Sequence, residues 1–151
     1  MIQRIQSVFL LLTALAAIIF LNSPFLTFID NSGNNISLTA LGAVSSGKEK
    51  IASYFLLPVL AGIIPLMALF IILLFNNRQL QIKLTGILVA LEIGFIILTA
   101  VCAFYIIRKY DAAIASWIKA LVPFIQIILT VLALRAIRKD EDMVKSYDRI
   151  R

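Results

Sequence analysis

The sequence predicts an all-α membrane protein, folded as an antiparallel bundle of four transmembrane helices. Of its 151 residues, 62% are hydrophobic and only 15% are charged, whereas soluble domains carry about 45–50% apolar and 25% charged residues. Four apolar stretches come close to the roughly 20 residues that a spanning helix needs. Most connections between them are short, which favours antiparallel neighbours. We therefore expect one membrane domain over residues 1–151.

The expected spans are residues 5–28, 54–75, 84–107 and 118–134. The first could also be a secretory signal, because Arg4 precedes the apolar stretch. We favour an uncleaved span, since the small-residue pattern at residues 14–16 lies in the middle of the stretch. In the third span, an acid costs about 2.5–3.5 kcal/mol, and the large apolar residues outweigh it with roughly 4–8 kcal/mol. That span is therefore expected to insert.

The distribution of basic residues predicts that both chain ends face the cytoplasm, because inner loops of membrane proteins carry more Lys and Arg. With this orientation, nine of the basic residues lie inside and five outside. The inner ones are Arg4, Arg78, Lys83, Arg135, Arg138, Lys139, Lys145, Arg149 and Arg151. The aromatic side chains Tyr54, Tyr105, Tyr110 and Trp117 fall near the outer boundary, where such rings settle.

Residues 29–53 form the one sizeable connection, which is expected outside the cell. Asp30 to Asn35 is a dense turn signal, and residues 36–41 alternate apolar and polar side chains. This pattern predicts a small extracytoplasmic β-hairpin. An isolated hairpin is marginal in water, so it would rest on the helix ends or on a partner. Residues 108–117 are expected to form a short outer turn, in which 112–116 could extend the fourth span.

Glu92 is the strongest candidate for a functional residue, because an ionisable side chain within a span faces the bundle or a cavity. Equal counts from the span ends place Thr13, Glu92 and Gln126 at one depth. We call these three residues the polar layer, and we expect Gln126 to donate to the Glu92 carboxyl group. Two interpretations stay open: a polar contact that fixes helix packing, or a binding site for a proton or another cation.

Prolines and glycines interrupt the spans. Pro58, Pro65 and Pro123 are expected to kink their helices, because proline removes a backbone donor. Gly86 and Gly94 are expected to let a neighbouring helix approach closely.

The sequence offers no catalytic residue, no metal site and no cofactor motif. It contains no histidine and a single cysteine, Cys102, which disfavours a metalloenzyme, a histidine-dependent hydrolase and a thiol-redox enzyme that needs a cysteine pair. Phosphate-binding loops, dinucleotide fingerprints and nucleophile elbows are also missing. Asp140 to Asp142 is a charge run whose members point in different directions on a helix.

Residues 135–151 are expected to form a cytoplasmic helical extension of the fourth span. Its apolar residues share one face, and charges occupy the rest. It could anchor to lipid headgroups or dock on a cytoplasmic partner. The residues expected to take part in docking are Arg138, Lys139, Met143, Tyr147, Arg149 and Arg151.

The two ends of the chain carry a resemblance. Met1 to Gln6 before the first apolar run, together with Arg135 to Glu141 leading to Ser146 to Arg151, resembles a family of small bacterial four-span inner-membrane proteins that is catalogued as a domain of unknown function. The resemblance covers the whole chain and implies a multi-pass protein of the bacterial cytoplasmic membrane. It implies no activity, so it transfers no functional residue.

These observations lead to a functional hypothesis of a non-enzymatic accessory or structural subunit within a larger membrane complex, related to translocation or to the cell envelope. The expected partners are the lipid bilayer, other membrane subunits and a cytoplasmic partner at the tail, with the ribosome as a speculative example. The alternative hypothesis is a small transporter or proton-linked channel that uses Glu92. A lack of matching half-repeats with broken helices disfavours this alternative.

Overall fold

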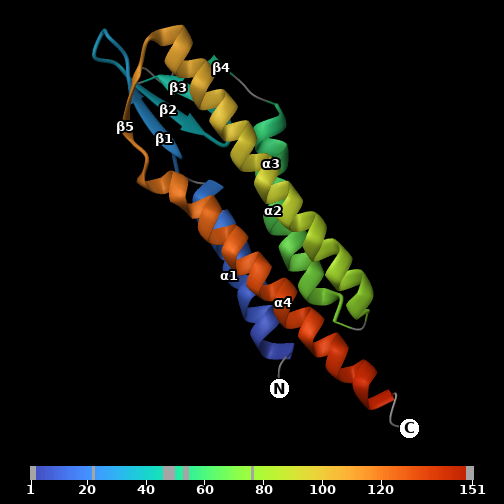
Figure 1. Ribbon diagram of the computed structural model, residues 1–151. Coiled ribbons are helices and arrows are strands. Elements are labelled where there is room, and N and C mark those ends of the chain that lie inside the picture. Colours follow the sequence, from blue (N-terminus) through green and yellow to red (C-terminus); the bar gives the residue numbers. More distant parts are fainter. Residues whose placement is uncertain (1–2, 22, 46–49, 53–54, 76, 149–151) are drawn as a thin grey trace.

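The computed structural model describes residues 3–21, 23–45, 50–52, 55–75 and 77–148. It is mostly helical, with a small β-sheet at one end of a four-helix bundle (Figure 1). The long helices are α1 (Gln3–Leu21), α2 (Leu56–Leu73), α3 (Arg78–Tyr110) and α4 (Val122–Asp148), and a short 3₁₀ helix, η1 (Ile118–Leu121), leads into α4.

The four helices form the expected antiparallel bundle. α1 and α3 each pack against both α2 and α4, so consecutive helices are neighbours. α1 begins and α4 ends at the end of the bundle opposite the sheet (Figure 1). Asn77 caps the start of α3, because its side-chain oxygen accepts a hydrogen bond of 3.2 Å from the Leu80 amide.

Within the described ranges, three helical segments are long and apolar enough to cross a membrane: Leu56–Leu73, Arg78–Tyr110 and Ile118–Val144. The apolar part of α1, Ile5–Leu21, is shorter. The prediction that the first span reaches residue 28 is wrong, because α1 ends at Leu21. Pro24 follows, which lacks an amide donor, and Leu26–Ile29 then forms a strand. The prediction passed over Asn22-Ser23-Pro24, a polar break between two apolar segments.

The sheet contains the predicted hairpin. Strand β1 (Leu26–Ile29) pairs antiparallel with β2 (Asn35–Thr39), in a register that sets Leu26 opposite Leu38. At the turn, the Ser32 hydroxyl donates to Asp30 Oδ2 at 2.7 Å. Gly33 has a φ of 79°, a backbone conformation that residues other than glycine rarely adopt.

The sheet is larger than the predicted hairpin, so the description of the fold as all-α is corrected. Its strand order is β4-β3-β2-β1-β5, where β3 is Gly42–Ser45, β4 is Lys50–Ala52 and β5 is Ala113–Ser116. The interpretation of residues 113–116 as a turn or helix extension is wrong. They pair with the second edge of β1, whose backbone groups would otherwise lack hydrogen-bond partners.

The sheet rests on the bundle, as the hairpin was expected to do. Its buried face carries Leu26, Phe28, Ile36, Leu38 and Ala43, which belong to the same hydrophobic core as the bundle interior. With 33 residues, α3 is roughly 50 Å long at 1.5 Å per residue, which exceeds the hydrocarbon thickness of about 30 Å. Its last turns therefore continue past the bundle and across the sheet (Figure 1).

Three phenylalanine rings join the sheet to the bundle. Phe20 at the end of α1 stacks on Phe25, with ring centroids 4.2 Å apart. Phe95 of α3 meets both rings edge-on, at 6.0 and 5.8 Å. Offset-stacked and edge-to-face arrangements are the preferred geometries of aromatic pairs, so this cluster fixes how the sheet sits on the helices.

The glycines of α3 do not support the predicted close helix packing. A Cβ atom added to Gly86 or Gly94 would meet no heavy atom within 4 Å. Gly86 is exposed and Gly94 is half-buried. Both positions therefore face outward, and the bundle packs through Leu88, Glu92 and Phe95 of the same helix instead.

Candidate functional site: a polar layer in the bundle core

The structure brings the three predicted members of the polar layer into the bundle interior. Thr13 of α1, Glu92 of α3 and Gln126 of α4 are 0%, 2% and 3% exposed. Thr13 lies near the middle of α1 and Glu92 near the middle of α3, each on the core-facing side of an apolar helix. All three side chains therefore face the core, as the sequence predicted.

Thr130, which sequence reasoning missed, makes the central contact. Its hydroxyl oxygen lies 2.8 Å from Glu92 Oε1 and 3.0 Å from the carbonyl oxygen of Gln126. A hydroxyl group carries a single hydrogen. Both contacts are hydrogen bonds at once when Glu92 is the protonated acid, because Glu92 then donates to Thr130 and Thr130 donates to the carbonyl. The geometry thus suits a neutral carboxyl group in an apolar core.

Thr13 adds the third helix to this contact. Its hydroxyl lies 3.4 Å from the Thr130 hydroxyl and 3.0 Å from the carbonyl oxygen of Phe9. The contacts of Thr130 with Thr13 and with Glu92 thereby link α1, α3 and α4. The signal that could have revealed Thr130 is its spacing, since it follows Gln126 by four residues and so lies on the same face of α4.

The expected hydrogen bond from Gln126 to Glu92 is not formed. Gln126 Nε2 and Glu92 Oε2 are both buried, and neither has a hydrogen-bond partner among the described residues. Instead, Gln126 lines a space of about 10 Å³ beside Ala17, Phe20 and Phe95. That volume is about the minimum that one water molecule requires. This space beside Gln126 is therefore too small for an organic substrate.

A second group of buried polar residues lies nearer the end of the bundle that holds the α2–α3 turn. Gln81 Nε2 donates to the carbonyl oxygen of Ile71 at 3.2 Å, and the Thr85 hydroxyl donates to the carbonyl of Gln81 at 2.7 Å. Gln6 of α1 is 3% exposed. Gln81 thus satisfies a backbone acceptor at the end of α2, which is a structural task.

Of the three prolines predicted to kink helices, only Pro65 lies beyond the first turn of its helix. Pro65 is buried in the interior of α2. Pro58 is the third residue of α2 and Pro123 the second of α4. Amide groups in the first turn have no partner within the helix, so a proline there removes no hydrogen bond. The prediction of kinks at Pro58 and Pro123 is therefore wrong.

The predicted tail is helical, since α4 continues without a break to Asp148. Arg78 at the start of α3 pairs with Asp140, their Nη1 and Oδ2 atoms being 2.8 Å apart. The same guanidinium donates to the carbonyl oxygen of Asp140 at 3.2 Å. Asp140 is thus held by α3. Among the predicted docking residues, Arg149, Arg151 and the Tyr147 side chain lie outside the described part.

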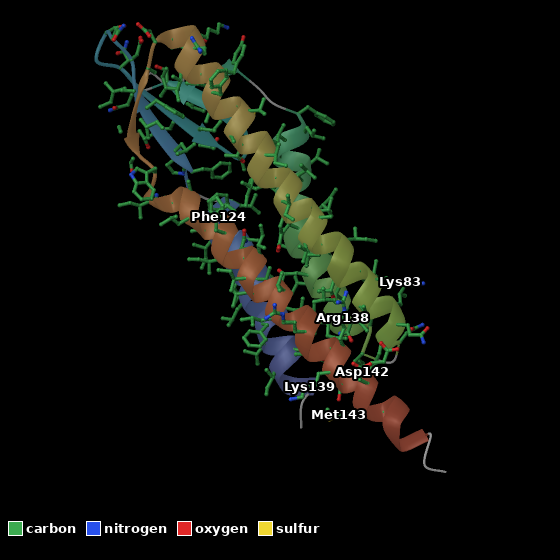
Figure 2. The ribbon with its side chains drawn as sticks, in the orientation of Figure 1. Lys83, Phe124, Arg138, Lys139, Asp142 and Met143 are labelled. Carbon is green, nitrogen blue, oxygen red and sulfur yellow. The ribbon has the colours of Figure 1, made fainter. Side chains whose placement is uncertain are left out.

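Charged side chains gather at the end of the bundle far from the sheet. Figure 2 shows Lys83 on α3 and Arg138, Lys139 and Asp142 on α4 at that end, with Phe124 at the other. Met143 lies beside Asp142 on the last turns of α4. The predicted docking residues that the structure describes therefore share one end of the molecule with the α2–α3 turn.

The described residues contain no group of three or more His, Cys, Asp or Glu side chains that could hold a metal ion. Cys102 is buried in the hydrophobic core and belongs to no disulfide. The best-defined polar feature of the described interior is thus the contact among Thr13, Glu92 and Thr130, which joins three helices.

Comparison with known proteins gave one match. No curated protein and no solved structure matches the chain. A family model for a domain of unknown function, DUF4293, matches residues 2–150. Because the match covers nearly the whole chain, the protein belongs to the DUF4293 family of unknown function.

Proposed function

We propose that this protein is a four-span accessory or structural subunit of a larger complex in the bacterial cytoplasmic membrane, with both chain ends in the cytoplasm. In this proposal it performs no catalysis. It holds a sheet on the outer surface and presents a charged helix to a partner on the inner side.

The spanning arrangement is supported by the lengths of the helices. Ile5–Leu21 has 17 residues, which is the lower limit for a spanning helix, and the other three apolar helices are longer. α1 packs against both α2 and α4. If these two helices cross the membrane, α1 beside them crosses it as well. The excess of Lys and Arg at the end opposite the sheet supports placing that end inside the cell.

The observation that carries the subunit role is the length of α4. With 27 residues, α4 is roughly 40 Å long, about 10 Å more than the hydrocarbon core. Its last turns project beyond α1 and the α2–α3 turn (Figure 1). The exposed residues Arg138 and Lys139 lie where α4 passes the α2–α3 turn, next to Asp140, which Arg78 of α3 holds, and the exposed Asp142 follows on the projecting part. A rigid charged helix that leaves the membrane fits a docking element better than a flexible lipid anchor.

The polar layer supports a structural role for the bundle itself. Glu92 contacts Thr130 across two helices, and the adjoining space holds no more than a water molecule. A transporter would need a cavity for its cargo near this depth. We therefore assign Glu92 to helix packing.

The test is extraction of the native chain from membranes in a mild detergent, followed by sizing and mass spectrometry. We expect a stoichiometric membrane partner. The double variant Arg138→Glu, Lys139→Glu should lose that partner, because it reverses the charge of the projecting helix. Lys83→Glu changes a charge at the same end of the bundle but on α3, so it should retain the partner.

A chain that elutes alone or as a homo-oligomer would contradict the subunit role. A partner that binds both variants equally well would place the docking surface elsewhere than α4. Resistance of the chain to extraction by alkaline carbonate tests the membrane assignment separately.

A further inference from the structure

We propose that the groove between α1 and α4 binds one anionic phospholipid, with its acyl chain along the helices and its phosphate at Lys119. The inference rests on the membrane placement proposed above and is independent of the subunit role.

The groove lies near the sheet end of the bundle, where α1 ends and α4 begins. It has a volume of about 360 Å³, which falls in the range typical of ligand sites. Its walls are apolar, formed by Ala16, Ile19 and Phe20 of α1 and by Val122 and Ile125 of α4. An apolar groove of this size along two helices matches the shape and chemistry of a lipid chain.

The polar groups of the groove are confined to its end nearest the sheet. Ser23 follows α1, and Lys119 belongs to η1, just before α4. Among the described residues, no carboxylate forms an ion pair with the Lys119 ammonium group. The ion pair between Arg78 and Asp140 lies at the far end of the bundle. A cation above an apolar groove is complementary to an amphiphile with an anionic head.

The neighbours of Lys119 place it at the level of lipid headgroups. Trp117 and Ile118 are 58% and 71% exposed, and Leu121 is exposed on the same turn. Tryptophan settles at the membrane–water interface, and a lysine stem can lie along apolar surface while its ammonium group reaches the headgroups. The groove below η1 therefore lies at acyl-chain depth, as the proposed lipid requires.

A second copy of the chain is the competing occupant of the groove. An apolar helix from another copy would cover Ile19 and Ile125, but its apolar face would bring no anion to the exposed Lys119 ammonium group. An anionic headgroup would interact favourably with that charge. The charge therefore favours a phospholipid over a homodimer.

The experiment is native mass spectrometry of the full chain in mild detergent, with added phosphatidylglycerol or phosphatidylcholine of identical acyl chains. We expect one bound phosphatidylglycerol per chain and a preference of about fivefold over phosphatidylcholine, the contribution of one basic residue near a lipid surface. Lys119→Gln should abolish the preference. Ala16→Trp should fill the groove and prevent retention of either lipid.

Lys109→Gln is the matched control. Lys109 also lies at the sheet end, but it sits on α3 over the rings of Tyr105 and Tyr110 and does not line the groove. Its substitution should leave the preference intact. Equal binding of the two lipids, equal effects of the two lysine variants, or a dimer in place of the lipid complex would overturn the proposal. None of these outcomes would alter the resistance of the chain to carbonate extraction.

Discussion

Thr130 and Glu92 lie 38 positions apart in the sequence, yet their side-chain oxygens are 2.8 Å apart in the middle of the bundle. This contact joins α4 to α3, and Thr13 brings α1 to the same point. Because no polar solvent competes for these groups in the bundle core, the contact selects one relative height for three helices.

Thr130→Val should weaken the bundle, because valine keeps the shape of threonine but removes the hydroxyl group. Hydrogen bonds between spanning helices average about 0.6 kcal/mol and reach about 1.7. We expect a loss in this range in the free energy of unfolding measured in detergent. Thr130→Ser retains the hydroxyl and should lose less. Equal losses for the two variants would show that packing, and not the hydrogen bond, is decisive.

Glu92→Gln should change the free energy of unfolding by less than about 1 kcal/mol, since an amide can donate to Thr130 as the protonated acid does. Glu92→Lys introduces an ammonium group at mid-span, which costs about 2.5–3.5 kcal/mol on the insertion scale. The amount of folded protein in the membrane and its unfolding in detergent provide the measurement. A Gln variant as unstable as the Lys variant would mean that the carboxylate charge itself is required.

Breaking the Arg78–Asp140 pair should have a small effect. The two side chains are 25% and 13% exposed, so solvent screens the pair, and we expect a coupling energy of at most about 1 kcal/mol. The cycle of Arg78→Ala, Asp140→Ala and the double variant measures this energy. The coupling should shrink as salt is raised. A coupling energy that does not change with salt concentration would indicate that the hydrogen bond from Arg78 to the Asp140 carbonyl dominates.

Gly86→Ala should stabilise the isolated chain by about 0.5–1 kcal/mol, because alanine restricts the unfolded backbone and suits a helix better. The new methyl group meets no atom of the chain within 4 Å. Thermal unfolding of the purified protein is the measurement. Destabilisation by this variant would reveal that another helix packs closely on this face of α3.

Phe25→Ala should destabilise the protein by about 3–5 kcal/mol, the usual cost of removing a buried aromatic ring. Phe25 is 1% exposed and stacks on Phe20, so its loss opens a cavity between the sheet and the bundle. Phe55→Ala is the control, since the Phe55 side chain is 83% exposed. Similar losses for the two variants in an unfolding assay would contradict the role assigned to the aromatic cluster.

The local features of this fold were predictable, while the long-range pairings were not. The apolar stretches and the turn signal at Asp30 to Asn35 predicted the helices and the β1–β2 hairpin. Strands β3, β4 and β5 were missed. Ala113–Ser116, for example, is short and becomes a strand by pairing with β1. The end of α1 was misplaced because the short apolar segment after Asn22-Ser23-Pro24 was read as helix, and a short apolar segment suits a helix and a buried strand alike.

The candidate site shows the same division. Equal depth along straight helices predicted that Thr13, Glu92 and Gln126 share one layer, since the rise per residue is fixed. The choice of hydrogen-bond partner depends on side-chain direction and on helix rotation, which counting residues does not define. Gln126 therefore lines a small space beside Phe95. Thr130 makes the contact with Glu92 that was predicted for Gln126.

The sequence by itself determined that lipid-compatible helices make up most of this protein, because hydrophobicity and its length along the chain are local properties. It also determined the charge asymmetry between the two ends of the bundle. Only the tertiary structure decided that five strands form one sheet, that Thr130 meets Glu92 and that α1 and α4 leave a groove beside Lys119. These features arise when distant segments meet, and their energies depend on geometry that no single segment contains.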